Sequence, residues 1–315
     1  MTERAAVPGD RGLAVQATLL AAMLVWGLNV PAVKALIHWF DPLLLAAVRM
    51  VVACLALTAI LAWKRCSLAG ISGRAWVALV ACGVLMVYCN QILFAEGLLR
   101  STATNASLIM ALSPLVSALL AAAAFREPLT LQRIAGVALG FLGVGAVVLS
   151  HPGAGLSRAS VGDLMLAGGV VSFAAGGAIV QRLARRLHPL AISWAIYAIG
   201  TLLLVLHRWA GGAPLSVPVV FPGWRPWALV LFSGVMATAV SNLAWNGAIA
   251  RIGVARTAVF LYWVPVFGVL FAGLFLGERL TPWHLAGFAG VMGGTYLGTR
   301  RPAAPASTIA PARQP

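Results

Sequence analysis

Apolar runs of about twenty residues follow one another along almost the entire chain, and only short polar segments separate them. A helix needs about 20 mostly apolar residues to cross the hydrocarbon layer of a membrane. The longest break, residues 208–225, contains three prolines and is predicted to be a loop, so no room is left for a soluble domain. The pattern predicts ten transmembrane helices at residues 13–33, 42–63, 75–98, 102–124, 131–150, 163–180, 189–207, 226–250, 254–276 and 282–299.

The composition supports a membrane protein. Hydrophobic residues make up 61% of the 315 residues and charged residues only 9%, whereas a soluble domain has about 45–50% and about 25%. The first apolar run is longer than the 7–15 residues of a signal-peptide core, so we expect a retained helix rather than a cleaved signal. Residues 1–12 are expected to form a short cytoplasmic segment, and the Pro/Ala-rich residues 301–315 a disordered cytoplasmic tail.

The net charge of +15 would suit a nucleic-acid-binding protein, but the basic residues occur in runs of no more than two. Nucleic-acid recognition needs a clustered basic face, so we expect no nucleic-acid partner. With the N-terminus in the cytoplasm, 15 Lys and Arg residues fall on inner segments and six on outer ones, and Arg49, inside a span, completes the 22. This excess follows the positive-inside rule and predicts that both termini are cytoplasmic.

Two short segments match at a spacing of about 151 residues. Pro114 precedes the run Arg126-Glu127-Pro128-Leu129-Thr130, and Pro265 precedes the run Gly277-Glu278-Arg279-Leu280-Thr281. The chain therefore divides into two repeats, 13–150 and 151–300, of five helices each. Because five is odd, the second repeat enters the membrane from the opposite side. The predicted fold is an all-α integral membrane protein of ten transmembrane helices in two inverted five-helix repeats, the arrangement of secondary transporters.

These features resemble the EamA-type branch of the drug/metabolite transporter (DMT) superfamily. The resemblance rests on Trp26-Gly27-Leu28-Asn29, on Arg49, and on the paired Pro…Glu-x-Leu-Thr…Gly segments. It implies an exporter or exchanger of small metabolites in the bacterial cytoplasmic membrane. Ile196 stands near the position where Arg49 would map in the second repeat, so any role of Arg49 is not duplicated.

Pro114 and Pro265 lie near the middle of the fourth and ninth predicted spans. A proline inside a helix lacks an N–H donor and displaces the carbonyl four residues earlier. Freed carbonyls at membrane depth must face protein, water or substrate. We interpret the two prolines as kinks beside a central substrate cavity; the alternative is that the helices simply tolerate them.

Two charged residues lie within predicted spans. An arginine at the centre of a membrane costs about 2.5–3.5 kcal/mol on insertion scales. Arg49 could extend toward the surface, bind an anionic group of a substrate, or connect helices. Glu96 precedes Arg100 by four residues, so it could form an ion pair on one helix face or couple transport to protons.

Amide and aromatic side chains gather in a few spans. Buried amides need partners, which interhelical hydrogen bonds can supply. The other interpretation is a pocket for amphipathic metabolites such as amino acids, with Trp194 and Tyr197 as weaker candidates. The candidate substrate-binding residues among them are Trp26, Asn29, Asn90, Gln91, Asn242, Trp245, Asn246, Tyr262 and Trp263.

The sequence lacks the motifs of ATP-driven pumps, hydrolases and metalloproteases, and its cysteines and histidines form no ligand cluster. We expect no enzyme activity, no cofactor and no metal. The expected partners are a small-molecule substrate and membrane lipid, with protons and a homodimer left open.

Four-residue glycine spacings, as at Gly136 and Gly140, suit packing within the bundle or a dimer face. Alternative functions are a channel, a lipid scramblase or a scaffold without transport.

Overall fold

The computed structural model describes residues 8–36, 39–100, 109, 112–125, 130–149, 161–210, 224–276 and 282–299, and this part of the chain contains helices and no strand. Several predicted segments lie outside the described residues: 1–7 and 301–315 at the termini, the segments around Glu127 and Glu278, and the loop at 211–223. Residues 8–12 of the predicted N-terminal segment are described and are helical. The helices are α1 (Pro8–Leu36), α2 (Pro42–Trp63), α3 (Gly73–Cys82), α4 (Asn90–Arg100), α6 (Ser113–Phe125), α7 (Leu131–Leu149), α8 (Val161–Leu183), α9 (Pro189–Ala210), α10 (Trp224–Leu231), α11 (Ser241–Ile252), α12 (Val254–Val259), α13 (Trp263–Leu276) and α14 (Pro282–Thr299).

Short segments of a different helical type interrupt the α-helices. Two are π-helical, η1 (Gly83–Cys89) between α3 and α4 and η2 (Phe232–Val240) between α10 and α11. A third, η3 (Phe260–Tyr262), is a 3-10 helix between α12 and α13. The two π-helical segments, η1 and η2, are part of the candidate functional site.

Six helical stretches of the described residues are long and apolar enough to cross a membrane: 12–29, 43–63, 73–94, 161–183, 189–210 and 224–252. Shorter apolar helices lie at 131–143, 254–268 and 285–294. The membrane-spanning, all-α character predicted from the sequence is therefore confirmed, while the count of ten spans stays a prediction.

Local sequence explains where several helices begin. The Asp41 carboxylate accepts hydrogen bonds from the backbone N–H groups of Leu43 and Leu44, each at 3.0 Å, and Pro42 follows as the first helical residue of α2. The Ser72 hydroxyl caps α3 by accepting from the Ala75 N–H. Such caps satisfy backbone donors that the first helical turn leaves free.

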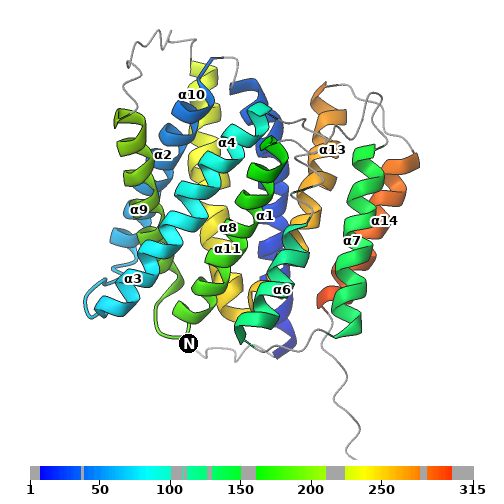
Figure 1. Ribbon diagram of the computed structural model, residues 1–315, viewed down its shortest axis with the longest axis horizontal. Coiled ribbons are helices and arrows are strands. Elements are labelled where there is room, and N and C mark those ends of the chain that lie inside the picture. The colour runs from blue at the N-terminus through cyan, green and yellow to red at the C-terminus, as the bar shows by residue number, and fades with distance from the viewer. Residues whose placement is uncertain are drawn as a thin grey trace, which may run out of the picture.

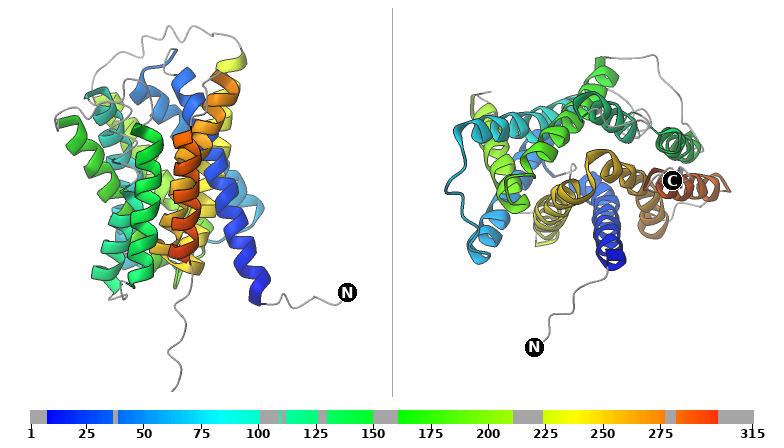
Figure 2. Two further views of the ribbon diagram at one scale, coloured as in Figure 1. Left: turned by 90° about the vertical axis from the view of Figure 1, so that its right-hand side faces the viewer. Right: turned by 90° about the horizontal axis from the view of Figure 1, so that it is seen from below.

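The helices form one bundle with an attached pair (Figure 1). Helices α7 and α14 lie side by side at one edge, and α2, α9 and α3 lie toward the other (Figures 1 and 2). A Cβ atom added to Gly294 would come within 2.6 Å of the Gly136 carbonyl oxygen, and one on Gly290 within 2.8 Å of the Gly143 Cα. The glycine spacing therefore serves packing within the chain, and a homodimer stays a prediction.

Related contacts join the two halves of the bundle. Gly83 in η1 packs against Ile199 of α9, and Gly234 in η2 packs against Val52 of α2. A Cβ atom on either glycine would also meet a backbone oxygen at 3.1 Å, that of Ile196 in the first case and that of Arg49 in the second. Ile196 and Arg49 thus take matching places in two contacts of the same kind.

Candidate functional site

Both π-helical segments receive hydrogen bonds from a helix of the other half. In a π-helix the backbone bonds run over five residues, and such turns are frequent at functional sites. The Trp26 indole of α1 donates to the Ala237 carbonyl of η2 at 2.6 Å, and the Ser233 hydroxyl of η2 donates to the Asn29 side chain at 2.6 Å. The Ser172 hydroxyl of α8 donates to the Leu85 carbonyl of η1 at 2.7 Å.

The predicted Trp26-Gly27-Leu28-Asn29 segment is therefore a docking point for η2. Gly27 between the two polar residues allows close approach, because a Cβ atom there would lie 3.0 Å from the Gly268 backbone nitrogen of α13. One turn of α1 thus contacts η2 on one side and α13 on another. Trp26 and Asn29 are half-buried in this arrangement.

An aromatic cluster lies next to this docking point. The Trp245 ring of α11 is 5.7 Å from the Trp26 ring and 5.8 Å from the Phe173 ring, measured between centroids. Trp245 is only 1% exposed. Aromatic pairs at such distances contribute more than their buried area alone. The cluster brings together α1, α8 and α11, which are far apart in the sequence.

One face of α9 carries a stripe of buried polar residues, Ser193, Tyr197 and Thr201, which we call the α9 stripe. Their spacing of four residues places them one helical turn apart on the same face. Asn246 Nδ2 donates to the Ser193 hydroxyl at 3.0 Å, and the Thr201 hydroxyl donates to the Met50 carbonyl at 3.2 Å. The stripe therefore connects α11 to α2.

Tyr197, the middle residue of the α9 stripe, lies within electrostatic range of Arg49 on α2. The sequence prediction treated Tyr197 only as a weak candidate and did not name Ser193 or Thr201. The period of four residues among three polar side chains in an apolar span was a signal that could have identified the stripe. Its partners could not be identified in the same way, because they lie on other helices.

Arg49 Nε, Trp245 Nε1 and Asn246 Oδ1 are buried polar atoms that have no hydrogen-bond partner in the part of the chain that the structure describes. We call these residues the unpartnered set. Most buried polar atoms in proteins are hydrogen-bonded, and each exception needs an explanation. Leaving one unsatisfied costs about 1–3 kcal/mol. The set offers two donors, one of them cationic, and one acceptor. The donors can bind a carboxylate group, and the acceptor can bind an ammonium group.

Three other predicted residues hold helices in place. Asn90 Nδ2 donates to the Gly169 carbonyl of α8 at 3.0 Å, and Asn242 Nδ2 donates to the Thr238 carbonyl at 2.8 Å, one turn earlier. The Tyr262 hydroxyl donates to the Val137 carbonyl of α7 at 2.7 Å. The bonds of Asn90 and Tyr262 are interhelical, and the bond of Asn242 is local. A role of these residues in substrate binding stays a prediction.

Trp263 and Gln91 are two further predicted residues. The Trp263 ring stacks on the Phe267 ring, with centroids 5.5 Å apart. Gln91 is half-buried.

Pro114 and Pro265 occupy the first turn of a helix. Pro114 is the second residue of α6, and Pro265 is the third residue of α13, directly after the 3-10 segment η3. A proline is well tolerated there, because the first N–H groups of a helix have no intrahelical partner. The sequence predicts a kink within one continuous helix at Pro265. The structure instead has a 3-10 segment there, followed by a new helix that contains Pro265 in its first turn. The central cavity predicted beside the two prolines stays a prediction.

Glu96 forms an ion pair with Arg100, and the guanidinium also donates to the Glu96 backbone carbonyl at 3.0 Å. The two side chains are 37% and 51% exposed, respectively. The pair lies at the C-terminal end of α4. This geometry agrees with the ion-pair alternative for Glu96.

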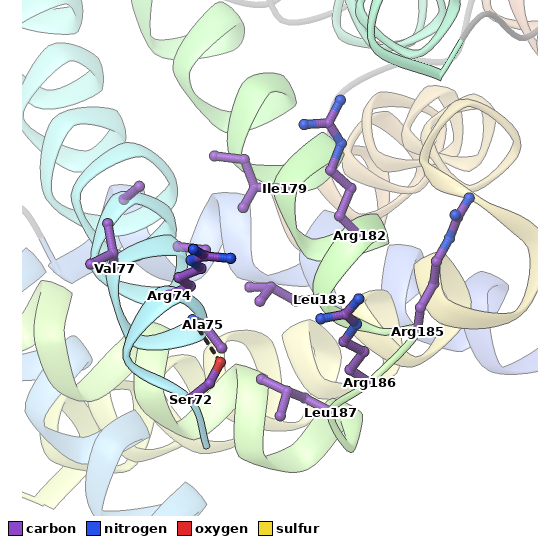
Figure 3. A pocket seen from close by; sticks show the side chains of 12 residues that line it. Ser72, Arg74, Ala75, Val77, Ile179, Arg182, Leu183, Arg185, Arg186 and Leu187 are labelled. Atoms are coloured by element: carbon purple, nitrogen blue, oxygen red, sulfur yellow. Dashed lines mark hydrogen bonds between the residues drawn. The ribbon is translucent and has the colours of Figure 1, made fainter. Parts of the chain in front are cut away.

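A cavity of about 850 Å³ lies elsewhere, between the first turns of α3 and the end of α8 with the turn that follows it (Figure 3). Four arginines line it: Arg74, Arg182, Arg185 and Arg186. We call it the arginine cavity. The described residues contain no group of three or more His, Cys, Asp or Glu side chains that could hold a metal ion.

Comparison with known proteins gives a consistent picture. The model of the EamA-like transporter family matches residues 14–149 and again 160–300. A probable terminal-alkyne amino-acid exporter of Streptantibioticus cattleyicolor is 28% identical over 289 residues, covering 90% of this chain and 92% of that protein. A probable amino-acid metabolite efflux pump of Salmonella typhimurium is 26% identical over 284 residues, covering 88% and 92%.

Other similarities concern a shorter region or the fold alone. The uncharacterized transporter YyaM of Bacillus subtilis is 27% identical over 192 residues, covering 60% of this chain and 62% of the length of that protein. A solved structure, described only as the crystal structure of a protein, superposes with a TM-score of 0.78 at 20% identity. It covers 91% of this chain and 96% of the other.

Proposed function

This chain belongs to the EamA-like transporter family, and we propose that it is a secondary transporter that exports or exchanges small polar or amphipathic metabolites such as amino acids by alternating access, with coupling to protons left open. In this proposal the chain is a transporter and not an enzyme. It crosses the bacterial cytoplasmic membrane ten times in two inverted five-helix repeats, with both termini in the cytoplasm. Relatives named as an amino-acid exporter and an amino-acid metabolite efflux pump support this substrate class.

The observation that carries the proposal is the unpartnered set, whose members lie on α2 and α11. A substrate carboxylate can accept from the Arg49 guanidinium and the Trp245 indole, and a substrate ammonium group can donate to Asn246 Oδ1. The aromatic rings of Trp26 and Phe173 beside Trp245 offer apolar contact for a side chain. An amphipathic molecule with one carboxylate and one ammonium group fits this combination of groups.

Alternating access needs two conformations of similar energy, which repeated structural units can provide. The matching contacts Gly83–Ile199 and Gly234–Val52 support such a repeat. The π-helical segments take part in both contacts, and a π-turn is a place where a helix can change its hydrogen bonding. We propose that η1 and η2 rearrange when the bundle opens to one side or the other.

Counterflow in proteoliposomes tests the proposal against its alternatives. The purified full-length chain is reconstituted, loaded with one amino acid of a panel, and supplied outside with a trace of the same labelled compound. A carrier accumulates label transiently and saturably. A linear, unsaturable flux would indicate a channel, and absence of flux for every panel member would support a scaffold.

The variant Trp245→Phe tests the site itself. It keeps an aromatic ring but removes the indole N–H, so we expect the apparent substrate affinity in counterflow to fall about fivefold to tenfold, as for one lost hydrogen bond. The smaller ring also leaves a gap beside the Trp26 and Phe173 rings, so the melting temperature of the substrate-free protein should fall as well. The matched control Trp209→Phe changes a residue that is 80% exposed and should behave like the parent. Equal affinity in Trp245→Phe and parent would contradict the site.

A further inference from the structure

The arginine cavity is a second site that the transport proposal does not use. It opens where α3 begins and α8 ends, at the ends of two membrane-spanning helices (Figure 3). Four of its twelve lining residues are arginines and none is acidic. On the predicted topology this is the cytoplasmic face, where anionic lipids attract basic segments.

Arg74 and Arg186 are the central cations of the arginine cavity. Their guanidinium groups extend toward each other from opposite sides of the opening, with Leu183 between them (Figure 3). Both side chains are exposed, so anchoring an anion there needs no rearrangement of the core. Arg182 and Arg185 lie on the side of α8 and add to the positive potential.

The two acidic residues that the structure describes on the helices of the cavity, Glu96 and Asp163, lie far along the chain from Arg74 and Arg186. Glu96 lies near the end of the column α3–η1–α4, and the cavity lies at its beginning. Asp163 lies at the beginning of α8, and the cavity lies at its end. The Ser72-capped first turn of α3 adds the positive end of a helix dipole. An anion is therefore the complementary ligand.

The walls of the arginine cavity distinguish a lipid from a small hydrophilic anion. Val77, Ala81 and Ile179 continue from the arginines along α3 and α8 toward the membrane interior, and Val77 is 71% exposed. An inorganic anion gains nothing from such walls, whereas the glycerol and acyl chains of a phospholipid lie against apolar side chains at this depth. We infer that the arginine cavity binds one anionic phospholipid, whose phosphate group contacts Arg74 and Arg186.

Native mass spectrometry of the purified full-length chain tests this inference with defined lipids. We expect one molecule of dioleoyl phosphatidylglycerol to be retained where dioleoyl phosphatidylcholine is not. The double variant R74Q/R186Q should lose about 30-fold in affinity for phosphatidylglycerol, since each basic residue near an anionic lipid contributes about fivefold. The control Arg251→Gln removes an exposed arginine that does not line the cavity, and should change the affinity by less than twofold.

Three results would overturn the inference. The first is equal retention of phosphatidylcholine and phosphatidylglycerol, and the second is an equal loss in Arg251→Gln, which would indicate general surface charge. The third is displacement of the lipid by glycerol 3-phosphate at matching concentration, which would indicate a free-anion site. The conservative variant R74K/R186K should retain most of the binding and guards against a folding defect. The measurement needs no transport, so its outcome is separate from that of the proposed function.

Discussion

The surroundings of the two π-helical segments share a framework but differ in chemistry. At η1 the neighbouring helix α9 contributes the backbone of Ile196 and the side chain of Ile199, and at η2 the neighbouring helix α2 contributes the backbone of Arg49 and the side chain of Val52. The helix contacts are alike, yet of the two matching residues Ile196 and Arg49 only Arg49, on the η2 side, is a cation. In the proposed mechanism the repeat serves the movement of helices, and departures from the repeat serve recognition of a ligand.

Side chains of other helices bond to both segments. At η1 the Ser172 hydroxyl donates to the Leu85 carbonyl and the Tyr88 hydroxyl is bonded to His207 Nδ1 at 3.0 Å, whereas η2 is bonded to Trp26 and Asn29. Two residues of the unpartnered set, Trp245 and Asn246, lie on α11 directly after η2. The unpartnered set thus lies beside η2, one of the two similar frameworks.

The largest effect should come from exchanging the residues that distinguish the two sides. Arg49→Gln removes the cation and with it a charge-assisted hydrogen bond to substrate, so counterflow should fall about tenfold to a hundredfold at equal membrane yield. Ile196→Val at the matching position should leave transport within about twofold, since it removes one methylene group in an apolar contact. Normal counterflow by Arg49→Gln would mean that Arg49 serves only to connect helices.

The shared framework predicts equal damage on both sides. A Cβ atom at Gly83 or Gly234 meets neighbouring atoms at 2.9 or 2.6 Å, so Gly83→Ala and Gly234→Ala should each lower stability by about 1–3 kcal/mol through overpacking. Gly247→Ala is the control, because nothing lies within 4 Å of a Cβ atom there. Thermal unfolding in detergent measures all three. A defect confined to one of the two glycines would show that the contacts are not equivalent.

The smallest effect is expected at Glu96, at the end of α4 beyond η1. Its carboxylate is partly exposed and paired with Arg100, and a surface pair of this kind contributes about 0–1 kcal/mol. Glu96→Gln should leave the dependence of transport on pH unchanged. A shifted or flattened pH profile in this variant, with normal yield, would instead assign proton coupling to Glu96.

Several features could be predicted from residues close together in the chain. The apolar runs predicted the membrane-spanning helices, and the four-residue spacing predicted the Glu96–Arg100 pair. The glycine spacing predicted close helix packing, which Gly136 and Gly294 make between α7 and α14. Each of these depends on local periodicity, or on a side chain within one helical turn, and therefore needs no knowledge of the neighbouring helices.

Other features depended on the positions of distant helices. The π-helical segments lie inside longer apolar runs, at 73–94 and 224–252, and the shift to five-residue bonding goes together with tight glycine contacts to α9 and α2. The partners of the α9 stripe lie on α2 and α11, roughly 50 to 150 residues away in the chain. No pattern within α9 could identify them.

The sequence by itself determined that this is a multi-pass membrane protein of the EamA-like family, because hydropathy and repeated motifs are properties of single segments. Only the tertiary structure decided which polar groups remain unpartnered and where four arginines form one cavity. Whether a buried donor is satisfied, or a cation is neutralised, depends on which helices pack beside it. Those helices are brought together by burial and close packing, which act between segments far apart in the chain.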